Sequence, residues 1–301
     1  MNASASFSFL LSCMPDKLKD ELLRQDTLKL TEIRLRAERP VQLKMTDASL
    51  QCAYIPGTSD ISKISEALSE HGLYARYDEA RRGFITLRGG HRLGLCGKVD
   101  IENGHALRLC DIASLCLRIA HEHKGLCAPL LPYLSAFDTL PSVLILGAPG
   151  TGKTTLLRDL ARHLSSSGIA VSINDERGEL AACQKGVPQL DVGISTDVLD
   201  GCQKAYGIRW LIRSMSPQVI ITDEISGKSD AAALLEARAS GVCVMASAHA
   251  GSMADFSARR DLMILRRLKL FDLTVVLKSG SAGIIQQVFS KEGVPWRLQS
   301  P

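Results

Sequence analysis

The stretch VLILGAPGTGKTT, residues 143–155, decides the fold because an apolar run is followed by a glycine-rich loop and then by a helix-forming segment. Gly147, Gly150 and Gly152 allow the backbone to wrap around an anion with successive N–H groups pointing inward. The N-terminus of the following helix adds a favourable dipole for phosphate. This order of strand, loop and helix is the context in which a P-loop binds a nucleoside triphosphate. The stretch therefore predicts an α/β domain with a parallel sheet and a phosphate site.

Polar side chains in the same loop predict a site for ATP and Mg²⁺. Lys153 brings a positive charge to the β- and γ-phosphates, and the hydroxyl of Thr154 is a ligand for Mg²⁺. The predicted nucleotide-binding residues are Gly147, Ala148, Pro149, Gly150, Thr151, Gly152, Lys153, Thr154 and Thr155.

A second apolar run, VIIT at residues 219–222, ends in two carboxylates, Asp223 and Glu224. A P-loop enzyme needs an acidic partner of this kind at the end of a buried strand, the Walker B position. We expect Asp223 to hold Mg²⁺ and Glu224 to orient and deprotonate the attacking water. Because nucleotide binding alone does not need Glu224, its presence favours hydrolysis.

Two further predicted strands, at 169–173 and 242–246, are followed by polar residues at the same edge of the sheet, where ligands of open α/β sheets bind. After the first strand, Glu176 is a candidate for the water or Mg²⁺ network. After the second, His249 is a candidate sensor of the γ-phosphate. A solvated acidic loop remains the alternative for Glu176, and a structural histidine for His249. The choice of Glu176 or Glu224 as the catalytic base stays open.

The P-loop begins near the middle of the 301 residues, which leaves room for a separate domain before it. We expect a smaller α+β domain over residues 1–135 and a P-loop ATPase domain over residues 136–301. In the first domain the patterns predict helices at 17–23, 61–71 and 111–123 and extended segments at 32–36, 40–43, 84–87 and 91–99. Asp60 is the expected cap of the second helix. Gly94 and Gly97 indicate bulges or close backbone approach.

In the second domain, apolar runs alternate with helical patterns, which is typical of a parallel sheet flanked by helices. Strands are predicted at 143–146, 169–173, 219–222, 242–246, 273–277 and 284–289. Helices are predicted from the P-loop to about 165 and from Asp230 to 241, with a mixed loop and helix crossover after the second strand. One apolar stripe has helical spacing and leaves Arg209 and Arg213 together on the opposite face. It consists of Ile208, Leu211, Ile212 and Met215.

The composition, 46% hydrophobic and 23% charged, is ordinary for a soluble globular protein. A net charge of +4, an aromatic content of 5% and the lack of a basic run interleaved with aromatics argue against nucleic-acid binding. The sequence holds no apolar stretch of the roughly 18 residues that a bilayer span needs. Residues 1–6 lack the basic region of a secretory signal. We therefore expect a cytoplasmic protein without a membrane span.

Longer strings carry a resemblance to a known family. They are GAPGTGKTTLLRDLAR, INDERGEL, GVPQLDVGISTDVLDGCQKA, LIRSMSPQVIITDEI and ASAHA in the second half, and EIRLRAERPVQL, YARYDEARRGFITLRGGHRLGLCGKV and DIASLCLRIAHEHKG in the first. Over nearly its whole length the chain resembles the stage III sporulation protein AA family, whose members are similar to the ATPases of type II and type IV secretion and of pilus assembly. The resemblance implies a RecA-like ATPase core behind an N-terminal domain and a homo-hexameric ring.

By this resemblance, Asp175, Glu176 and Glu179 match an acidic box and His249 matches a histidine box. The chain departs from the secretion relatives at Ser195 and at residues 225–228, where an arginine is expected. The intersubunit arginine therefore stays open. Candidates for an arginine finger are Arg213, Arg88, Arg92 and Arg118.

The resemblance also implies a function: a motor that hydrolyses ATP in the mother cell and docks on an inner-membrane protein of the channel between mother cell and forespore. Two other classes remain, a nucleic-acid-dependent RecA-like ATPase and a nucleotide switch or kinase. The fold alone does not choose among them. Glu224 and the separate first domain favour the motor.

Overall fold

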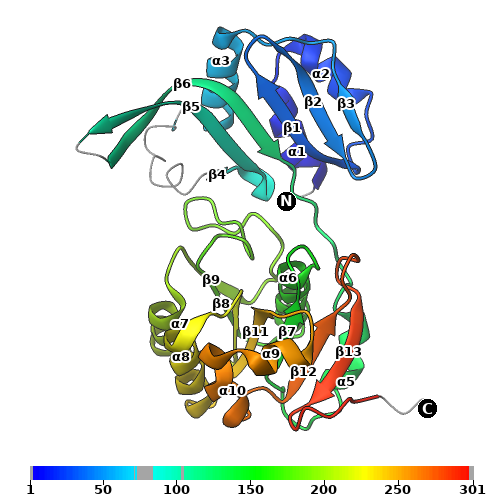
Figure 1. Cartoon of the computed structure of the whole chain (residues 1–301), viewed down its shortest axis with the longest axis vertical. Helices are drawn as coiled ribbons and strands as arrows, with labels where there is room; N and C mark the ends of the chain where they lie inside the picture. The colour runs from blue at the N-terminus through cyan, green and yellow to red at the C-terminus, as the bar shows by residue number, and fades with distance from the viewer. Residues whose placement is uncertain (1–2, 71, 73–83, 103–104, 298–301) are drawn as a thin grey trace. The chain divides into compact units, whose positions relative to one another are not determined.

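The computed structural model describes residues 3–70, 72, 84–102 and 105–297. The chain divides into two compact units, Met1–His121 and Glu122–Pro301, and most of their elements are labelled in Figure 1. The sequence analysis placed the boundary later, after residue 135. Residues 122–135 belong to the second unit because Cys127, Leu130 and Leu134 are buried in its core. The Cys127 N–H also donates a hydrogen bond of 2.9 Å to Asp159 Oδ2 in the same unit.

The first unit is an antiparallel sheet packed with helices, in agreement with the α+β expectation. Within the described residues its strands follow the order β3-β2-β1-β6-β5-β4. The elements are α1 (Ala3–Ser12), α2 (Asp16–Leu23), β1 (Leu30–Arg36), β2 (Arg39–Met45), β3 (Ser49–Gln51), α3 (Thr58–Leu68), β4 (Ile85–Thr86), β5 (Arg92–Glu102) and β6 (His105–Arg118). Ile33 and Leu35 of β1 are buried and pack in one core with Leu18 and Leu22 of α2.

Residues 111–123 do not form the predicted helix, and that prediction was wrong. Strand β6 instead runs to Arg118 and pairs antiparallel with β1 on one side and with β5 on the other. Leu115 and Leu117 are buried, with Cys116 between them half-buried. This two-residue period was present in the sequence beside a helical one, and the pairing on both strand edges decided between them.

Gly97 makes the close backbone approach that the sequence indicated. The register shifts there, and an added Cβ would lie 2.5 Å from the carbonyl oxygen of Asp111. Gly94 pairs regularly with Cys116 instead of forming a bulge. Asp60 is not the cap residue of α3, because the helix begins earlier. Asp60 lies in the first turn of the helix, and its Oδ2 accepts a hydrogen bond of 2.9 Å from the Gly57 N–H. The helix ends at Leu68, three residues before the predicted end at residue 71.

The second unit is built on a largely parallel sheet. Within the described residues the strand order is β13-β12-β7-β11-β10-β8-β9, and β12–β13 is its antiparallel pair. The elements are α5 (Leu131–Leu134), β7 (Val143–Gly147), α6 (Lys153–Ser166), β8 (Val171–Asp175), β9 (Thr196–Asp200), α7 (Lys204–Met215), β10 (Val219–Thr222), α8 (Gly227–Ala239), β11 (Cys243–His249), α9 (Met253–Ala258), α10 (Met263–Arg267), β12 (Leu273–Leu277) and β13 (Ile285–Ser290). The helices in the described ranges are all too short or too polar to cross a bilayer.

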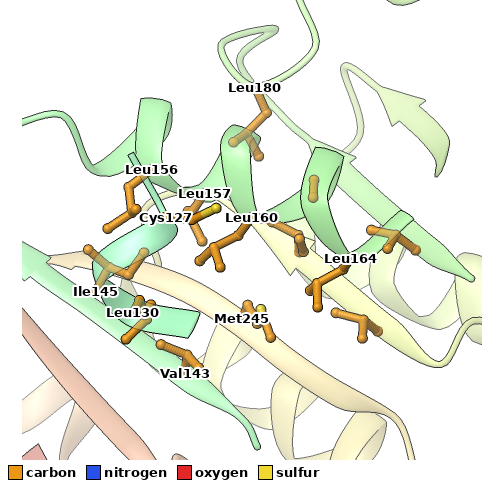
Figure 2. Packing of buried hydrophobic residues seen from close by; sticks show 14 of the residues in the cluster. Cys127, Leu130, Val143, Ile145, Leu156, Leu157, Leu160, Leu164, Leu180 and Met245 are labelled. Carbon is orange, nitrogen blue, oxygen red and sulfur yellow. The ribbon is translucent and has the colours of Figure 1, made fainter. Parts of the chain in front are cut away.

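Successive side chains of the central strands enter two different apolar cores, as the pleat of a strand requires. Val143 and Ile145 of β7 pack with α6 in the core shown in Figure 2. Leu144 and Leu146, between and after them, join the other core with buried residues of α7 and α8. Burial on both faces explains the nearly continuous apolar runs in the sequence.

Three details of the second unit differ from the sequence-based expectation. Strand β9 was missed because residues 196–200 lack an apolar run: only Val198 and Leu199 are apolar, and the strand lies at the sheet edge with its residues half-buried or exposed. Helix α8 starts at Gly227, before the predicted cap Asp230, whose Oδ2 accepts the Ser226 N–H at 2.8 Å. Met215 is 42% exposed, so the buried part of the apolar stripe on α7 is narrower than the four predicted residues.

Gly207 sets how closely α7 packs on β8. A Cβ at this position would lie 1.7 Å from Oδ1 of the fully buried Asn174. We expect Gly207→Ala to lower the free energy of unfolding of the second unit by about 1–3 kcal/mol through overpacking. Tryptophan fluorescence during urea unfolding measures this. The control is Gly251→Ala, whose Cβ would meet the exposed Asp255 carboxylate at 3.1 Å; equal stability of the two variants would contradict the expectation.

Candidate functional site

The sheet register brings the predicted polar residues to one edge. Thr222, the last residue of β10, pairs with Ala246 on one side and with Asn174 on the other. Strand β8 therefore extends one residue beyond β10, and β11 extends three, so that His249 is the last residue of β11 instead of following the strand. His249 pairs directly with Gly147, the first residue of the glycine loop. The carboxyl ends of β7, β11, β10 and β8 therefore lie together, the usual ligand-binding edge of an open α/β sheet.

The glycine loop has the backbone that the sequence predicted. Gly150 and Gly152 have φ values of 75° and 87°, in the left-handed region that favours glycine. A Cβ on Gly147 would lie 2.4 Å from Thr151 Oγ1, which itself donates to the Ala148 carbonyl at 2.8 Å. Side chains at these glycines would therefore strain or fill the loop.

Lys153 is buried at the start of α6, and its ammonium folds back over the loop. Nζ donates to the carbonyl oxygens of Gly147 at 2.8 Å and Ala148 at 3.0 Å. Burial lowers the pKa of Lys153, and the charge of Glu224 partly opposes this effect. The other predicted loop residues range from buried to exposed: Gly147 and Thr151 are buried, Ala148, Gly152, Thr154 and Thr155 are half-buried, and Pro149 and Gly150 are exposed.

Asp223 is 3% exposed at the end of β10 and contacts one ammonium group. Lys204 Nζ lies 2.9 Å from Asp223 Oδ1. Burial raises the pKa of Asp223 to about 6, although the charge of Lys204 acts in the opposite direction. For Lys204 itself, burial lowers the pKa, but the charges of Asp223 and Glu176 outweigh it and the net shift is upward.

The acidic segment after β8 contains two carboxylates with different surroundings. Asp175 is fully buried, and its two oxygens accept the N–H groups of Glu179 and Ala181 at 2.8 Å each. This carboxylate holds the loop in shape. Glu176 is partly exposed, and its Oε2 accepts from Lys204 Nζ at 2.7 Å. One ammonium thus joins Glu176 to Asp223.

Glu224 and His249, the other predicted catalytic residues, lie side by side. His249 Nδ1 is 3.4 Å from Glu224 Oε1, and Arg177 Nη1 is 3.7 Å from Glu224 Oε2. The side chains of Glu224 and His249 are 36% and 38% exposed, so water reaches both. The site therefore combines a buried acid, Asp223, with an accessible acid next to it.

Sequence comparison places this chain among known proteins. The family described as "Sporulation stage III, protein AA" matches residues 8–295. Stage III sporulation protein AA of Bacillus subtilis (strain 168) is 42% identical over 290 residues, covering 93% of this chain and 94% of the relative. The chain belongs to this sporulation family. A more distant relative, the uncharacterized protein ycf45 of Cyanidium caldarium, is 24% identical over 60% of this chain and 55% of its own length.

Two solved structures show the fold of this member of the sporulation family. The ATPase DotB of Legionella pneumophila has a TM-score of 0.63 at 16% identity, covering 93% of this chain and 82% of DotB. The pilus retraction motor PilT, solved with bound ADP, has a TM-score of 0.60 at 14% identity, covering 86% of this chain and 76% of PilT. These likenesses confirm the RecA-like α/β fold.

The site of this sporulation-family chain includes one residue that sequence reasoning missed, Lys204. A lysine at the start of a helix gives no local signal of burial, because lysine is usually exposed. Its role depends on contacts with residues 19 and 28 positions away along the chain, Asp223 and Glu176. The available signal was the apolar stripe of α7, which places the first residue of that helix near the strand ends.

Each arginine that is a candidate for the arginine finger lies next to residues of its own unit. Arg88 pairs with Glu70 at 2.5 Å, Arg118 lies 3.9 Å from Glu32, and the Arg92 guanidinium stacks 4.4 Å from the Phe84 ring centre. Arg213 lines a cavity of about 390 Å³ on α7 with Tyr206, Arg209, Trp210 and Ser214. These contacts leave the choice of an arginine finger as open as the sequence left it.

Proposed function

We propose that this chain is a P-loop ATPase that drives a channel complex between mother cell and forespore. The observation that carries the proposal is the arrangement of Lys153, Asp223 and Glu224 at one sheet edge. Glu224 is close enough to Lys153 for its charge to affect the pKa of the ammonium. A cation beside the phosphate loop, a buried acid and an accessible acid are the groups that phosphoryl transfer to water requires.

The residues of the loop fit ATP and Mg²⁺. The Lys153 ammonium donates its hydrogen bonds to the carbonyl oxygens of Gly147 and Ala148. Phosphate oxygens are stronger acceptors for a cation than these neutral carbonyls. Lys153 would exchange these carbonyls for the β- and γ-phosphates. Thr154 and Asp223 would hold Mg²⁺, which when bound neutralises charge on the phosphate oxygens. Apart from Pro149, which has no N–H, the other residues from Gly147 to Thr155 would surround the phosphates with backbone N–H groups.

Glu224 would take the proton of the attacking water, since it is the accessible acid next to Asp223. His249 Nδ1, 3.4 Å from Glu224 Oε1, would orient that carboxylate and sense the γ-phosphate. Glu176 shares the Lys204 ammonium with Asp223, so its contribution would come through the Mg²⁺ network.

The raised pKa of Asp223 predicts a pH effect on nucleotide binding. With a pKa of about 6, this carboxylate is ionised at pH 7.5 and mostly protonated at pH 5. We expect the tightening of ATP binding by Mg²⁺ to fall by about tenfold over this range, because protonated Asp223 no longer attracts the metal. Affinities for a fluorescent ATP analogue, measured with Mg²⁺ and with chelator, give this ratio. In Asp223→Asn only the nucleotide titrates over this range. If wild type and Asp223→Asn show the same pH dependence of this ratio, Asp223 is not the group that holds Mg²⁺.

The motor part of the proposal draws on relatives and on the two-unit architecture. PilT is named a pilus retraction motor, and the curated relative is a sporulation protein. We propose a homo-hexamer in the mother-cell cytoplasm, with the first unit docked on an inner-membrane protein of the channel. Several copies in a ring would make weak individual contacts sufficient.

Native mass measurement of the full chain with ATP and Mg²⁺ tests this assembly. Glu224→Gln is the suitable form, because it should keep the nucleotide bound. Six copies are expected, and a monomer at micromolar concentration would instead support a nucleotide switch. Single-stranded DNA is expected to leave ATP turnover unchanged; salt-sensitive binding with stimulated turnover would support the nucleic-acid-dependent ATPase.

A further inference from the structure

Lys204, the first residue of α7, carries an ammonium that is almost fully removed from water. Its side chain is 3% exposed, and Nζ lies 2.9 Å from Asp223 Oδ1 and 2.7 Å from Glu176 Oε2. The two carboxylates come from different strand ends, after β10 and after β8. A buried ammonium is unfavourable unless it is paired and hydrogen-bonded, so both contacts are needed to keep it there.

The backbone around Lys204 is fixed to β8 by several interactions. Asn174 Nδ2 donates to the Cys202 carbonyl at 3.0 Å, and the Gly201 N–H donates to the Asp175 carbonyl at 2.9 Å. One turn into α7, Gly207 packs against Asn174 with no room for a Cβ. The backbone that carries this ammonium is therefore held firmly against β8.

We propose that Lys204 is a positioning residue for the magnesium site: it fixes the Asp223 carboxylate and links it to Glu176. This inference rests on the proposed function, in which Asp223 holds Mg²⁺. An ion pair with only a structural role would have no need to join the two acids that follow neighbouring strands at the ligand-binding edge. The link also gives Glu176 a defined place beside the site without direct contact to nucleotide.

Removing the ammonium has two opposite effects on Mg²⁺. Loss of a positive charge near the acids favours the metal, whereas loss of the fixed geometry of Asp223 disfavours it. The proposal states that positioning is the larger effect. The direction of the change in Mg²⁺ dependence therefore distinguishes a positioning residue from a competing cation.

The test compares ATP affinity with Mg²⁺ and with chelator in wild type and Lys204→Met, using a fluorescent ATP analogue. In chelator, affinity is expected to stay within about threefold, because the glycine loop and Lys153 are intact. The tightening by Mg²⁺ is expected to fall by about tenfold, the usual loss when a partner of a metal ligand is removed. Unchanged or stronger tightening would overturn the proposal. If wild type itself binds no ATP, the proposed function fails first.

Two further variants complete the experiment. Lys185→Met removes an exposed lysine of the same unit and should behave as wild type. Lys204→Arg keeps the positive charge and offers donors to both carboxylates, so it is expected to restore part of the tightening of ATP binding by Mg²⁺. A variant that only repaired folding would change ATP affinity in chelator as well as with Mg²⁺. If Lys204→Met does not fold, Lys204→Gln, neutral but still a donor, is measured instead with the same two outcomes.

Discussion

Lys153→Ala is expected to abolish productive ATP binding and to lower turnover by a factor on the order of 100 to 1,000, the usual loss for one preorganised charge contact. Among the described residues 147–155, Lys153 carries the only formal charge, and its ammonium is already directed into the loop by the carbonyls of Gly147 and Ala148. Phosphate release and binding of a fluorescent ATP analogue measure the two effects.

The fold should survive Lys153→Ala, because the substitution removes a buried charge together with its two hydrogen bonds. Trp210 and Trp296 both lie in the second unit, so their fluorescence reports whether that unit is intact. Lys185→Ala, at an exposed position, is the matched control. Turnover at the wild-type rate by folded Lys153→Ala would show that the phosphate site has been assigned to the wrong residues.

Glu224→Gln should separate binding from chemistry. The amide keeps the shape of the side chain but does not accept the proton of water, so turnover is expected to fall by about 10²–10⁴-fold, the usual contribution of a general base. Affinity for ATP with Mg²⁺ should stay close to wild type, because Lys153, Thr154 and Asp223 are unchanged. Single-turnover hydrolysis and equilibrium binding provide both numbers, and loss of binding would instead place Glu224 among the metal-holding groups.

Glu176→Gln is the matched variant for this measurement. Its Oε2 is occupied by the Lys204 ammonium at 2.7 Å, so a smaller loss of turnover than in Glu224→Gln is expected. The reverse order, with near-normal turnover in Glu224→Gln and a large loss in Glu176→Gln, would move the base to the acidic segment.

The central part of the fold could be predicted because its signals are local. Each of three segments contains the residues that identify it as a strand or as a phosphate loop. They are the strand at Val143–Gly147, the glycine loop and the strand at Val219–Thr222. The carboxyl ends of parallel strands meet at one edge of a sheet, which is why Asp223 and His249 reach the same edge as Lys153. The predicted site residues thus needed only the order of the strands to come together.

The remaining features depend on contacts that are distant in sequence. Residues 111–118 carry both a helical and a two-residue period, and pairing of β6 with two neighbours selects the strand. Strand β9 is a polar edge strand, which lacks the apolar run of its neighbours. Lys204 gains its importance from two acids on other strands. Such features follow from tertiary structure, and no window of the sequence contains them.

Spore formation with a hydrolysis-deficient chain tests the central claim most directly. In an endospore-forming host whose own copy is replaced by this chain, wild type should support sporulation and Lys153→Ala should block it after engulfment, at equal protein level. Immunoblotting establishes the level, and heat-resistant spore counts give the outcome. Normal spore numbers with Lys153→Ala would contradict an ATP-driven motor.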